Sequence, residues 1–282
     1  MMMKIGELLQ KFRLEQGKTR KEFASDVVSP SYYCKIEKGS HRVSAEDLIE
    51  LLKRNNIRLS DFFGMFDSQD LAKQLNLFHE MMINAHYNDD RKTLEKIPEL
   101  IQKSQLPEKI KKEQVLIARG WIETVKKSTE PVNWKLREQL REKVFNLPNW
   151  NEEKLTLFCN LMPLYDCFSV NLIVQDILKE YKPPFSKELK RILLGIICNN
   201  LFLKLKIGEY EGIDKLVSIA DAIPSSPDLV FYKNSVIFYK NLALYKSSNA
   251  TKYLKKCQKA IEICAWLGME AYAQHMSEFL EG

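Results

Sequence analysis

A pattern that repeats about every 40 residues constrains the fold of this 282-residue chain more than any other feature. The repeated element is a short apolar stretch that ends in a polar residue, at His79, Arg119, Asn160, Asn200 and Asn241. Pairs of antiparallel helices produce repeats of this length, because each pair must stack on the next to bury its apolar face. The sequence therefore predicts an all-α chain, most of it an α-solenoid similar to tetratricopeptide repeats.

Breaks rich in Pro, Gly, Asn and Ser divide the repeat region into helical segments. The β-branched alternation that is typical of strands is missing from the sequence. We expect about five antiparallel helix pairs followed by a terminal helix. The expected helices span residues 69–85, 88–104, 107–127, 132–146, 151–163, 166–181, 185–206, 208–221, 227–246, 250–266 and 268–281.

The N-terminal part of the chain carries a different pattern, which predicts five short helices. Thr19 and Glu22 have the spacing of a capping box. Ser29 followed by Pro30 is typical of a helix start, because Ser caps the helix and Pro lacks only an N–H that would have no partner there. Gly39 suits the left-handed conformation that ends a helix. These signals place a short helix between Ser29 and Gly39.

This short helix has a buried side and an outward side. Tyr33 and Ile36, three residues apart, are expected to form its buried stripe. The residues left to point outward are Pro30, Ser31, Cys34, Lys35 and Lys38. A fourth helix with a leucine-rich inner face follows, and a fifth is expected over residues 59–66.

These residues resemble the Xre class of helix-turn-helix domains. The shared residues are Arg13, Gly17, Thr19, Glu22, Ala24, Ser29, Ile36, Glu37 and Gly39. The chain departs from the class in three ways: Arg20 stands where Gln is common, Tyr33 replaces the usual Ile, and the turn is short and lacks its usual Gly. The resemblance implies a DNA-binding domain and a partly buried Arg13–Glu37 ion pair. The alternative is a five-helix bundle with no role in nucleic-acid binding.

We expect residues 29–38 to form the recognition helix in the major groove of double-stranded DNA. Ser31 and Lys35 are the expected base readers, because a lysine pairs well with guanine O6 or N7. Lysines and arginines exceed Asp and Glu by only three in residues 1–66, so we expect two copies on a pseudo-palindromic site. The predicted DNA-binding residues are Arg20, Lys21, Ser29, Pro30, Ser31, Tyr32, Lys35, Lys38 and Arg42, with Arg20, Lys21, Lys38 and Arg42 on phosphates.

An Xre-type domain joined to about five degenerate helix pairs resembles the Rgg family of transcriptional regulators, also called Rgg/GadR/MutR. The resemblance covers the whole chain, and its N-terminal motif is the specific part. It implies a DNA-binding domain over residues 1–66 and a TPR-like repeat domain over residues 67–282 for dimerisation and peptide binding. It also implies a homodimer that senses a short hydrophobic peptide pheromone in Gram-positive quorum sensing. The direction of control stays open between activation, with RNA polymerase as a further partner, and repression by occlusion.

The polar residues of the repeat offer a way to hold such a peptide. In a right-handed solenoid the first helix of each pair lines the concave wall, where an Asn can bond to an extended peptide backbone. The predicted peptide-binding residues are Arg119, Asn160, Asn199, Asn200 and Asn241, with Arg119 attracting a ligand carboxylate. The aromatic candidates for hydrophobic pockets are Phe158, Tyr165, Phe168, Phe202, Phe231, Phe238 and Tyr239. Alternatively, the polar side chains tie neighbouring helices together or face solvent.

Other functional classes lack sequence support. The chain has no run of about 18 apolar residues and no hydrophobic signal region, so we expect a cytoplasmic protein without membrane attachment. Its four histidines show no HExxH spacing, and P-loop, dinucleotide-binding and GxSxG motifs are missing, so we predict neither an enzyme nor a cofactor. The six cysteines form no CxxC pair and are expected to be reduced core residues. The remaining alternative is a ligand-independent phage-type or bacteriocin-operon regulator whose repeat domain binds a protein.

Overall fold

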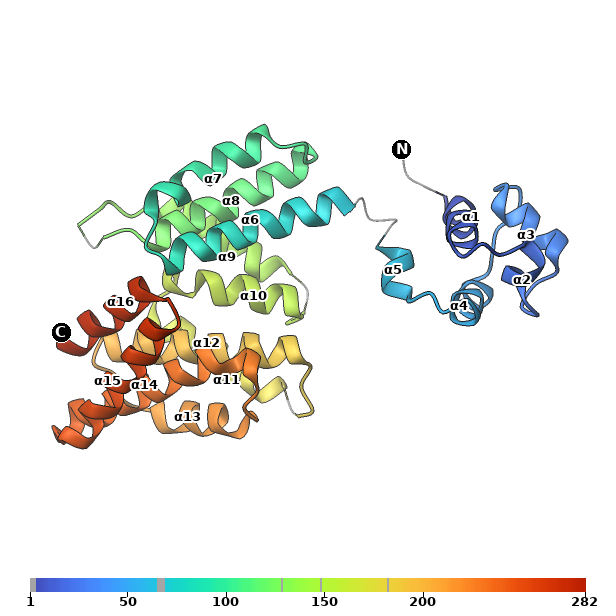
Figure 1. The fold of residues 1–282 in the computed structure, drawn as a ribbon. Coiled ribbons are helices and arrows are strands. Elements are labelled where there is room, and N and C mark those ends of the chain that lie inside the picture. Colours follow the sequence, from blue (N-terminus) through green and yellow to red (C-terminus); the bar gives the residue numbers. More distant parts are fainter. Residues whose placement is uncertain (1–3, 65–68, 128, 148, 182) are drawn as a thin grey trace. The chain divides into compact units, whose positions relative to one another are not determined.

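The computed structural model describes residues 4–64, 69–127, 129–147, 149–181 and 183–282, and the regular elements in these ranges are all helices (Figure 1). The chain divides into two compact units, Met1–His79 and Glu80–Gly282. The boundary expected between residues 66 and 67 lies outside the described residues. Within those described ranges, none of the helices combines the length and the apolar character that crossing a bilayer requires.

The first unit contains the five predicted short helices. The capping box is present, since the Glu22 backbone N–H donates to Thr19 Oγ1 at 3.3 Å and the Thr19 N–H donates to the Glu22 carboxylate at 2.7 Å. Gly39 has a φ of 68° and ends the recognition helix, as predicted. The helices are α1 (Ile5–Glu15), α2 (Arg20–Ala24), α3 (Pro30–Glu37), α4 (Ala45–Arg54) and α5 (Leu59–Phe63). Residues 65 and 66 of the expected fifth helix lie outside the described residues.

The core of the first unit locks α3 against α1. Tyr33 and Ile36 are buried as predicted, and the Tyr33 ring lies 5.5 Å from that of Phe23 on α2. At Gly6 the two helices approach so closely that a Cβ would lie 2.0 Å from the carbonyl oxygen of Ile36. Only glycine can occupy this position, because the obstructing atom belongs to the backbone.

The helices that follow form five pairs, α6/α7 to α14/α15, and a terminal helix α16, which confirms the predicted architecture. From the second pair onward the first helix of each pair packs on the first helix of the next: α8 on α10, α10 on α12 and α12 on α14. The bounds are α6 (Gln69–Tyr87), α7 (Arg91–Lys103), α8 (Glu108–Thr124), α9 (Trp134–Asn146), α10 (Glu152–Leu161), α11 (Cys167–Glu180), α12 (Lys187–Lys206), α13 (Ile213–Ala222), α14 (Val230–Ser248), α15 (Thr251–Trp266) and α16 (Glu270–Glu281).

Several of the predicted helix boundaries were displaced. The segment expected from residue 208 starts at Ile213, because Gly208 and Gly212 have φ values of 72° and 75° and form a turn. In two other segments a proline, Pro163 at the end of one and Pro227 at the start of the other, lies outside regular α-helix. The 3₁₀ turns Met162–Leu164 and Pro227–Leu229 replace the expected α-helical residues there.

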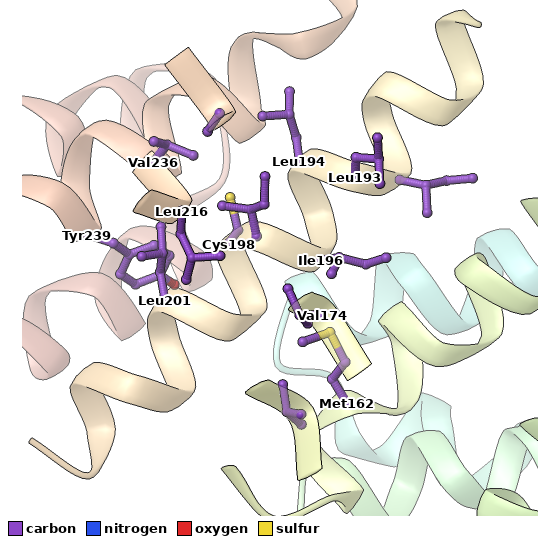
Figure 2. Close-up of a cluster of buried hydrophobic side chains, with 14 of the residues drawn as sticks. Met162, Val174, Leu193, Leu194, Ile196, Cys198, Leu201, Leu216, Val236 and Tyr239 are labelled. Atoms are coloured by element: carbon purple, nitrogen blue, oxygen red, sulfur yellow. The ribbon is translucent and has the colours of Figure 1, made fainter. Parts of the chain in front are cut away.

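The core of the second unit runs along its first helices. On α12, Leu193, Leu194 and Ile196 are almost fully buried, and Figure 2 shows them among side chains of α11, α13 and α14. The six cysteines are free thiols, as expected. Of these, Cys198, Cys257 and Cys264 are buried and act as small core residues.

Candidate functional site

The recognition helix is held in place by a buried carboxylate at its C-terminal end. Glu37 accepts from Arg13 Nε at 2.6 Å and from Arg20 Nε at 2.7 Å, so that one carboxylate joins α1, the start of α2 and α3. Burial alone would raise the pKa of Glu37, but the bonds from Arg13 and Arg20 outweigh it and hold this pKa below its usual range. The Arg13–Glu37 pair is confirmed, whereas the second arginine on Glu37 was not anticipated.

The outward face of α3 carries the side chains expected to read DNA. Ser31, Lys35 and Lys38 are exposed, and Cys34 is half-buried. Ser29 caps the helix by accepting from the Tyr32 N–H at 3.2 Å, and its hydroxyl lies 3.1 Å from that of Ser31. The helix is therefore anchored at both ends, which leaves its outer surface free to enter a groove.

Two of the residues predicted to contact DNA, Tyr32 and Arg20, also form hydrogen bonds within the protein. The Tyr32 hydroxyl donates to the Arg42 carbonyl at 2.8 Å, and its ring meets the edge of His41 at 5.6 Å. Tyr32 thereby holds the loop that presents Arg42. Arg20 points its Nε at Glu37, and a guanidinium keeps further N–H donors for a phosphate.

The second unit contains a cavity of about 760 Å³. Its wall comes from the ends of α6 and α8, from the loop that follows α8, and from α9, α12, α14 and α16. The first helices of four pairs therefore face one space, and the terminal helix α16 forms another side of it. This volume lies in the range of pockets that enclose a small organic ligand or part of a peptide.

One side of the cavity is aromatic. The ring of Tyr272 on α16 lies 5.6 Å from that of Tyr87 on α6, and Phe279 lies 4.9 Å from Phe202 on α12. Burial raises the pKa of Tyr239 in the same wall well above its usual value, so its hydroxyl stays neutral. Of the aromatic residues proposed from the sequence, Phe202, Phe238 and Tyr239 line the cavity. In contrast, Phe158 belongs to the core and Phe168 is 72% exposed.

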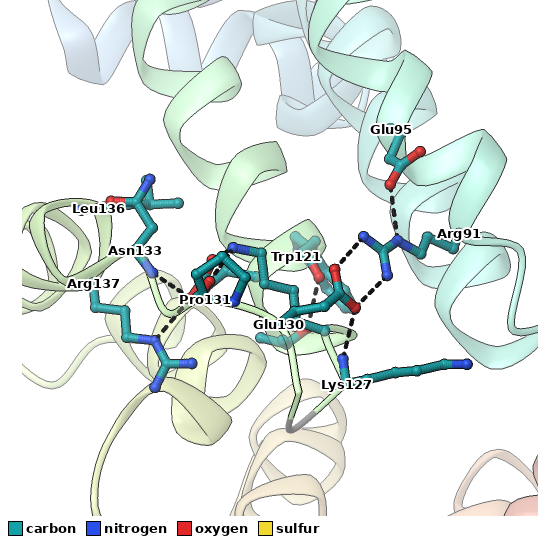
Figure 3. A network of polar contacts seen from close by, with 12 residues as sticks. Arg91, Glu95, Trp121, Lys127, Glu130, Pro131, Asn133, Leu136 and Arg137 are labelled. Atoms are coloured by element: carbon teal, nitrogen blue, oxygen red, sulfur yellow. Dashed lines mark hydrogen bonds and ion pairs between the residues drawn. The ribbon is translucent and has the colours of Figure 1, made fainter.

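Another part of the wall is polar and is built on the loop between α8 and α9, whose network Figure 3 shows. The buried Glu123 accepts from the Asn133 N–H at 3.0 Å and from Arg137 Nε at 3.1 Å, and Lys126 Nζ lies 2.7 Å from its second oxygen. Burial alone would raise the pKa of Glu123, but these donors keep it below its usual range. Both ends of the loop are thus tied to one carboxylate.

A second carboxylate ties the loop to the neighbouring pair. Glu130 receives two N–H bonds from Arg91 at the start of α7, at 2.6 and 2.7 Å, and accepts from the Lys127 N–H at 2.9 Å. These bonds lower the pKa of Glu130 to about 2. The sequence contained no local signal for this network, because its members come from separate helices and a loop.

The five residues of the predicted peptide ladder lie in different environments. Asn199 lines the cavity, and its amide donates to the Cys159 carbonyl of α10 at 2.9 Å. Arg119 is exposed and lines a separate pocket between α8 and α9. Asn241 is buried and donates to the Ile237 carbonyl of its own helix at 2.7 Å, whereas the 2%-exposed Asn200 leaves its side-chain oxygen without a partner among the described residues.

The wall of the large cavity includes neither Arg119, Asn160, Asn200 nor Asn241. Their role in peptide binding stays a prediction. Sequence reasoning missed most of the residues that do line the cavity, including Tyr87, Lys127, Lys206, Tyr272 and Phe279. They occupy different positions in different repeats, so the repeat itself carries no signal for them.

Fold and site together define a helix-turn-helix DNA-binding protein with a helical repeat unit that encloses a cavity. Residues 94–278 match the C-terminal domain of the HTH-type transcriptional regulator Rgg, and residues 9–62 match the helix-turn-helix family. The chain belongs to the Rgg family of transcriptional regulators. None of the curated protein sequences matches it.

Solved structures share this fold over nearly the whole chain. The pheromone receptor Rgg2 of Streptococcus dysgalactiae, which binds SHP pheromone, has a TM-score of 0.69 at 14% identity, covering 99% of both chains. ComR of Streptococcus thermophilus, solved with DNA and its signalling peptide ComS, has a TM-score of 0.67 at 18% identity and covers 97% of both chains. PlcR of Bacillus thuringiensis, solved with the peptide PapR7 and DNA, scores 0.69 at 15% identity, over 97% of this chain and 98% of PlcR.

Proposed function

We propose that this protein is a cytoplasmic, peptide-responsive transcription regulator without enzymatic activity. Residues 1–66 would bind DNA, and residues 67–282 would bind a short peptide and form a homodimer. The observation that carries the proposal is the 760 Å³ cavity with one aromatic and one polar wall in a chain that also holds an Xre-type domain. A peptide fits such a wall because its backbone needs donors and acceptors while its apolar side chains need burial.

In a homodimer, two-fold symmetry would place the two recognition helices on the two halves of a pseudo-palindromic DNA site. Two α3 helices would enter successive major grooves with half-site centres about 34 Å apart. Lys35 and Ser31 would reach base edges, and Arg20, Lys21, Lys38 and Arg42 would hold phosphates. The exposed face of α3 and the Glu37 anchor beneath it support this assignment. RNA polymerase would be a further partner if the protein activates transcription.

Two substitutions test this assignment. Lys35→Ala should weaken specific DNA binding by about 1–3 kcal/mol and flatten the preference at one base pair. Arg20→Ala should weaken binding to cognate and to random DNA alike. It should also lower the slope of log affinity against log salt concentration by about one unit. Binding is measured by fluorescence anisotropy on both DNAs at several salt concentrations. Equal losses on cognate and random DNA for Lys35→Ala would remove it as a base reader.

The peptide proposal is tested at two sets of positions, one inside the cavity wall and one outside it. If the cavity holds the ligand, Asn199→Ala should weaken peptide binding by about 1–3 kcal/mol. The same substitution at Asn160, Asn241 or Arg119 should weaken binding only if the predicted ladder also takes part. Isothermal titration with short hydrophobic peptides supplies the affinities, and circular dichroism checks the fold. A regulator whose repeat unit binds only a protein partner would bind none of these peptides.

A further inference from the structure

The cavity wall contains four carboxylates, and each faces a partner. Glu123 lies against Lys126 and Arg137, and Glu130 against Arg91, as described above. Asp89 and Glu278 each lie 3.9 Å from a ring nitrogen of His275. The charges of Glu123 and Glu130 are therefore opposed by permanent cations of the protein itself, whereas His275 opposes those of Asp89 and Glu278 only when it is protonated.

Two lysines of the same wall have no such partner. Lys127 belongs to the loop after α8, and Lys206 is the last residue of α12. Both are exposed, and neither ammonium lies within ion-pair distance of a carboxylate in the part of the chain that the structure describes. Figure 3 shows the Lys127 side chain extended, with no dashed line at its ammonium.

The surroundings of Lys206 favour a ligand that is anionic at one point and apolar beside it. The Lys206 ammonium lies 5.9 Å from the centre of the Phe202 ring, which in turn packs on Phe279. A ligand that covers these rings would exclude water, and the attraction between an ammonium and an anion strengthens as the local dielectric constant falls. This contact is of the cation–π type and leaves the N–H donors of the ammonium available to an anion.

We propose that Lys127 and Lys206 form a carboxylate-binding subsite of the cavity, and that the peptide ligand carries a matching carboxylate. This inference rests on the proposed peptide binding and adds a charge requirement to it. The carboxylate comes either from a free C-terminus or from an acidic side chain. A neutral or cationic hydrophobic peptide is then discriminated against, because it would cover the two ammonium groups without pairing them.

The test uses a pool of synthetic heptapeptides randomised over Leu, Ile, Val, Phe and Gly. Every peptide is N-acetylated, so that the amide form is neutral, and the pool is made with a free C-terminus, with an amidated C-terminus, and amidated with one added Asp. Equilibrium dialysis against the full-length protein with mass spectrometry identifies the peptides that are retained. The tightest of these is then titrated as its acid, amide and Asp-containing amide forms.

We expect an acidic form to bind about tenfold more tightly than the neutral amide at low salt. In the Lys127→Ala/Lys206→Ala variant this ratio should fall to near one, because the acidic form loses its partners while the amide no longer covers unpaired ammonium groups and binds at least as tightly. Lys259→Ala, at an exposed lysine of α15 outside the cavity wall, is the matched control and should keep the full ratio. Retained binding of the amide shows that the double variant still folds and keeps its cavity.

The possible outcomes distinguish failure of the carboxylate subsite from failure of peptide binding itself. Tight binding by the free C-terminus but not by the Asp-containing amide would assign the carboxylate to the peptide terminus, and the reverse would assign it to a side chain. Equal affinities of acid and amide forms, or a ratio that the double variant leaves unchanged, would overturn the carboxylate subsite while peptide binding stands. If no peptide of any pool is retained, the peptide-binding function itself is refuted.

Discussion

Each unit of the protein buries one carboxylate between cations, and the two clusters differ in how deeply their most buried cation lies. In the first unit Glu37 joins Arg13 and Arg20, whose side chains are 9% and 44% exposed. In the second unit Glu123 joins Lys126 and Arg137, which are 22% and 19% exposed. Both glutamate side chains are 1% exposed.

This difference separates a cluster that includes a deeply buried cation from one that holds the loop of the cavity wall. Without Glu37, the guanidinium of Arg13 would be left charged and buried. Without Glu123, Lys126 and Arg137 would recover part of their hydration, and the loop between α8 and α9 would adjust. We therefore expect the loss of Glu37 to cost the first unit more stability than the loss of Glu123 costs the second.

The largest expected effect breaks the first cluster. Glu37→Leu should cost about 3–5 kcal/mol of unfolding free energy in the first unit, because it leaves Arg13 uncompensated. The double variant Arg13→Met/Glu37→Leu should cost less than the two single variants together. All four tryptophans follow residue 120, so tryptophan fluorescence reports on the second unit alone while circular dichroism reports on both. Additive losses in thermal unfolding would show that the pair is not coupled.

The corresponding change in the second cluster should be smaller. Glu123→Leu should cost about 1–3 kcal/mol, because the Asn133 N–H loses its acceptor while the two cations regain water. Tryptophan fluorescence during denaturation measures this loss, and Glu138→Leu at an exposed position of α9 is the control. A loss as large as that of Glu37→Leu would remove the distinction between the two clusters.

A third substitution sharpens the comparison within the first unit. Ser25 ends α2 with φ 53° and ψ −138°, at the turn where the Xre class usually has Gly. A residue with a Cβ is strained in this conformation, so Ser25→Gly should stabilise the first unit by about 1 kcal/mol. Circular dichroism melts should shift upward while the fluorescence melt stays unchanged. An unchanged or lower melting temperature would mean that the turn is not strained.

The smallest effect concerns the Arg91–Glu130 pair, whose partners are both partly exposed. The pKa of Glu130 is lowered from 4.5 to about 2, so its stabilising contribution is complete above pH 4.5 and is lost as the pH falls toward 2. The difference in melting temperature between the wild type and Glu130→Gln should therefore be constant at neutral pH and shrink over this acidic range. A difference that persists at pH 2 would contradict the lowered pKa.

The sequence alone was sufficient for the helices of the first unit. Its capping pairs, such as Thr19 with Glu22, lie three residues apart, so each bond forms within a single turn and needs no tertiary contact. The buried spacing of Tyr33 and Ile36 is equally local. The Arg13–Glu37 pair was available only through the resemblance to the Xre class, because its partners are far apart in the chain.

For the second unit, the repeat length determined the number of helix pairs, but the tertiary structure decided which side chains meet. The cavity brings together Tyr87, Lys127, Phe202 and Tyr272, which come from three helices and a loop far apart in sequence. The neighbours Asn199 and Asn200 show why the repeat length does not decide which side chains face the cavity. Adjacent residues of an α-helix point about 100° apart, so Asn199 lines the cavity and Asn200 is buried beside it. A period of about 40 residues locates each helix along the chain, while the rotation of that helix about its own axis is set by packing against its neighbours.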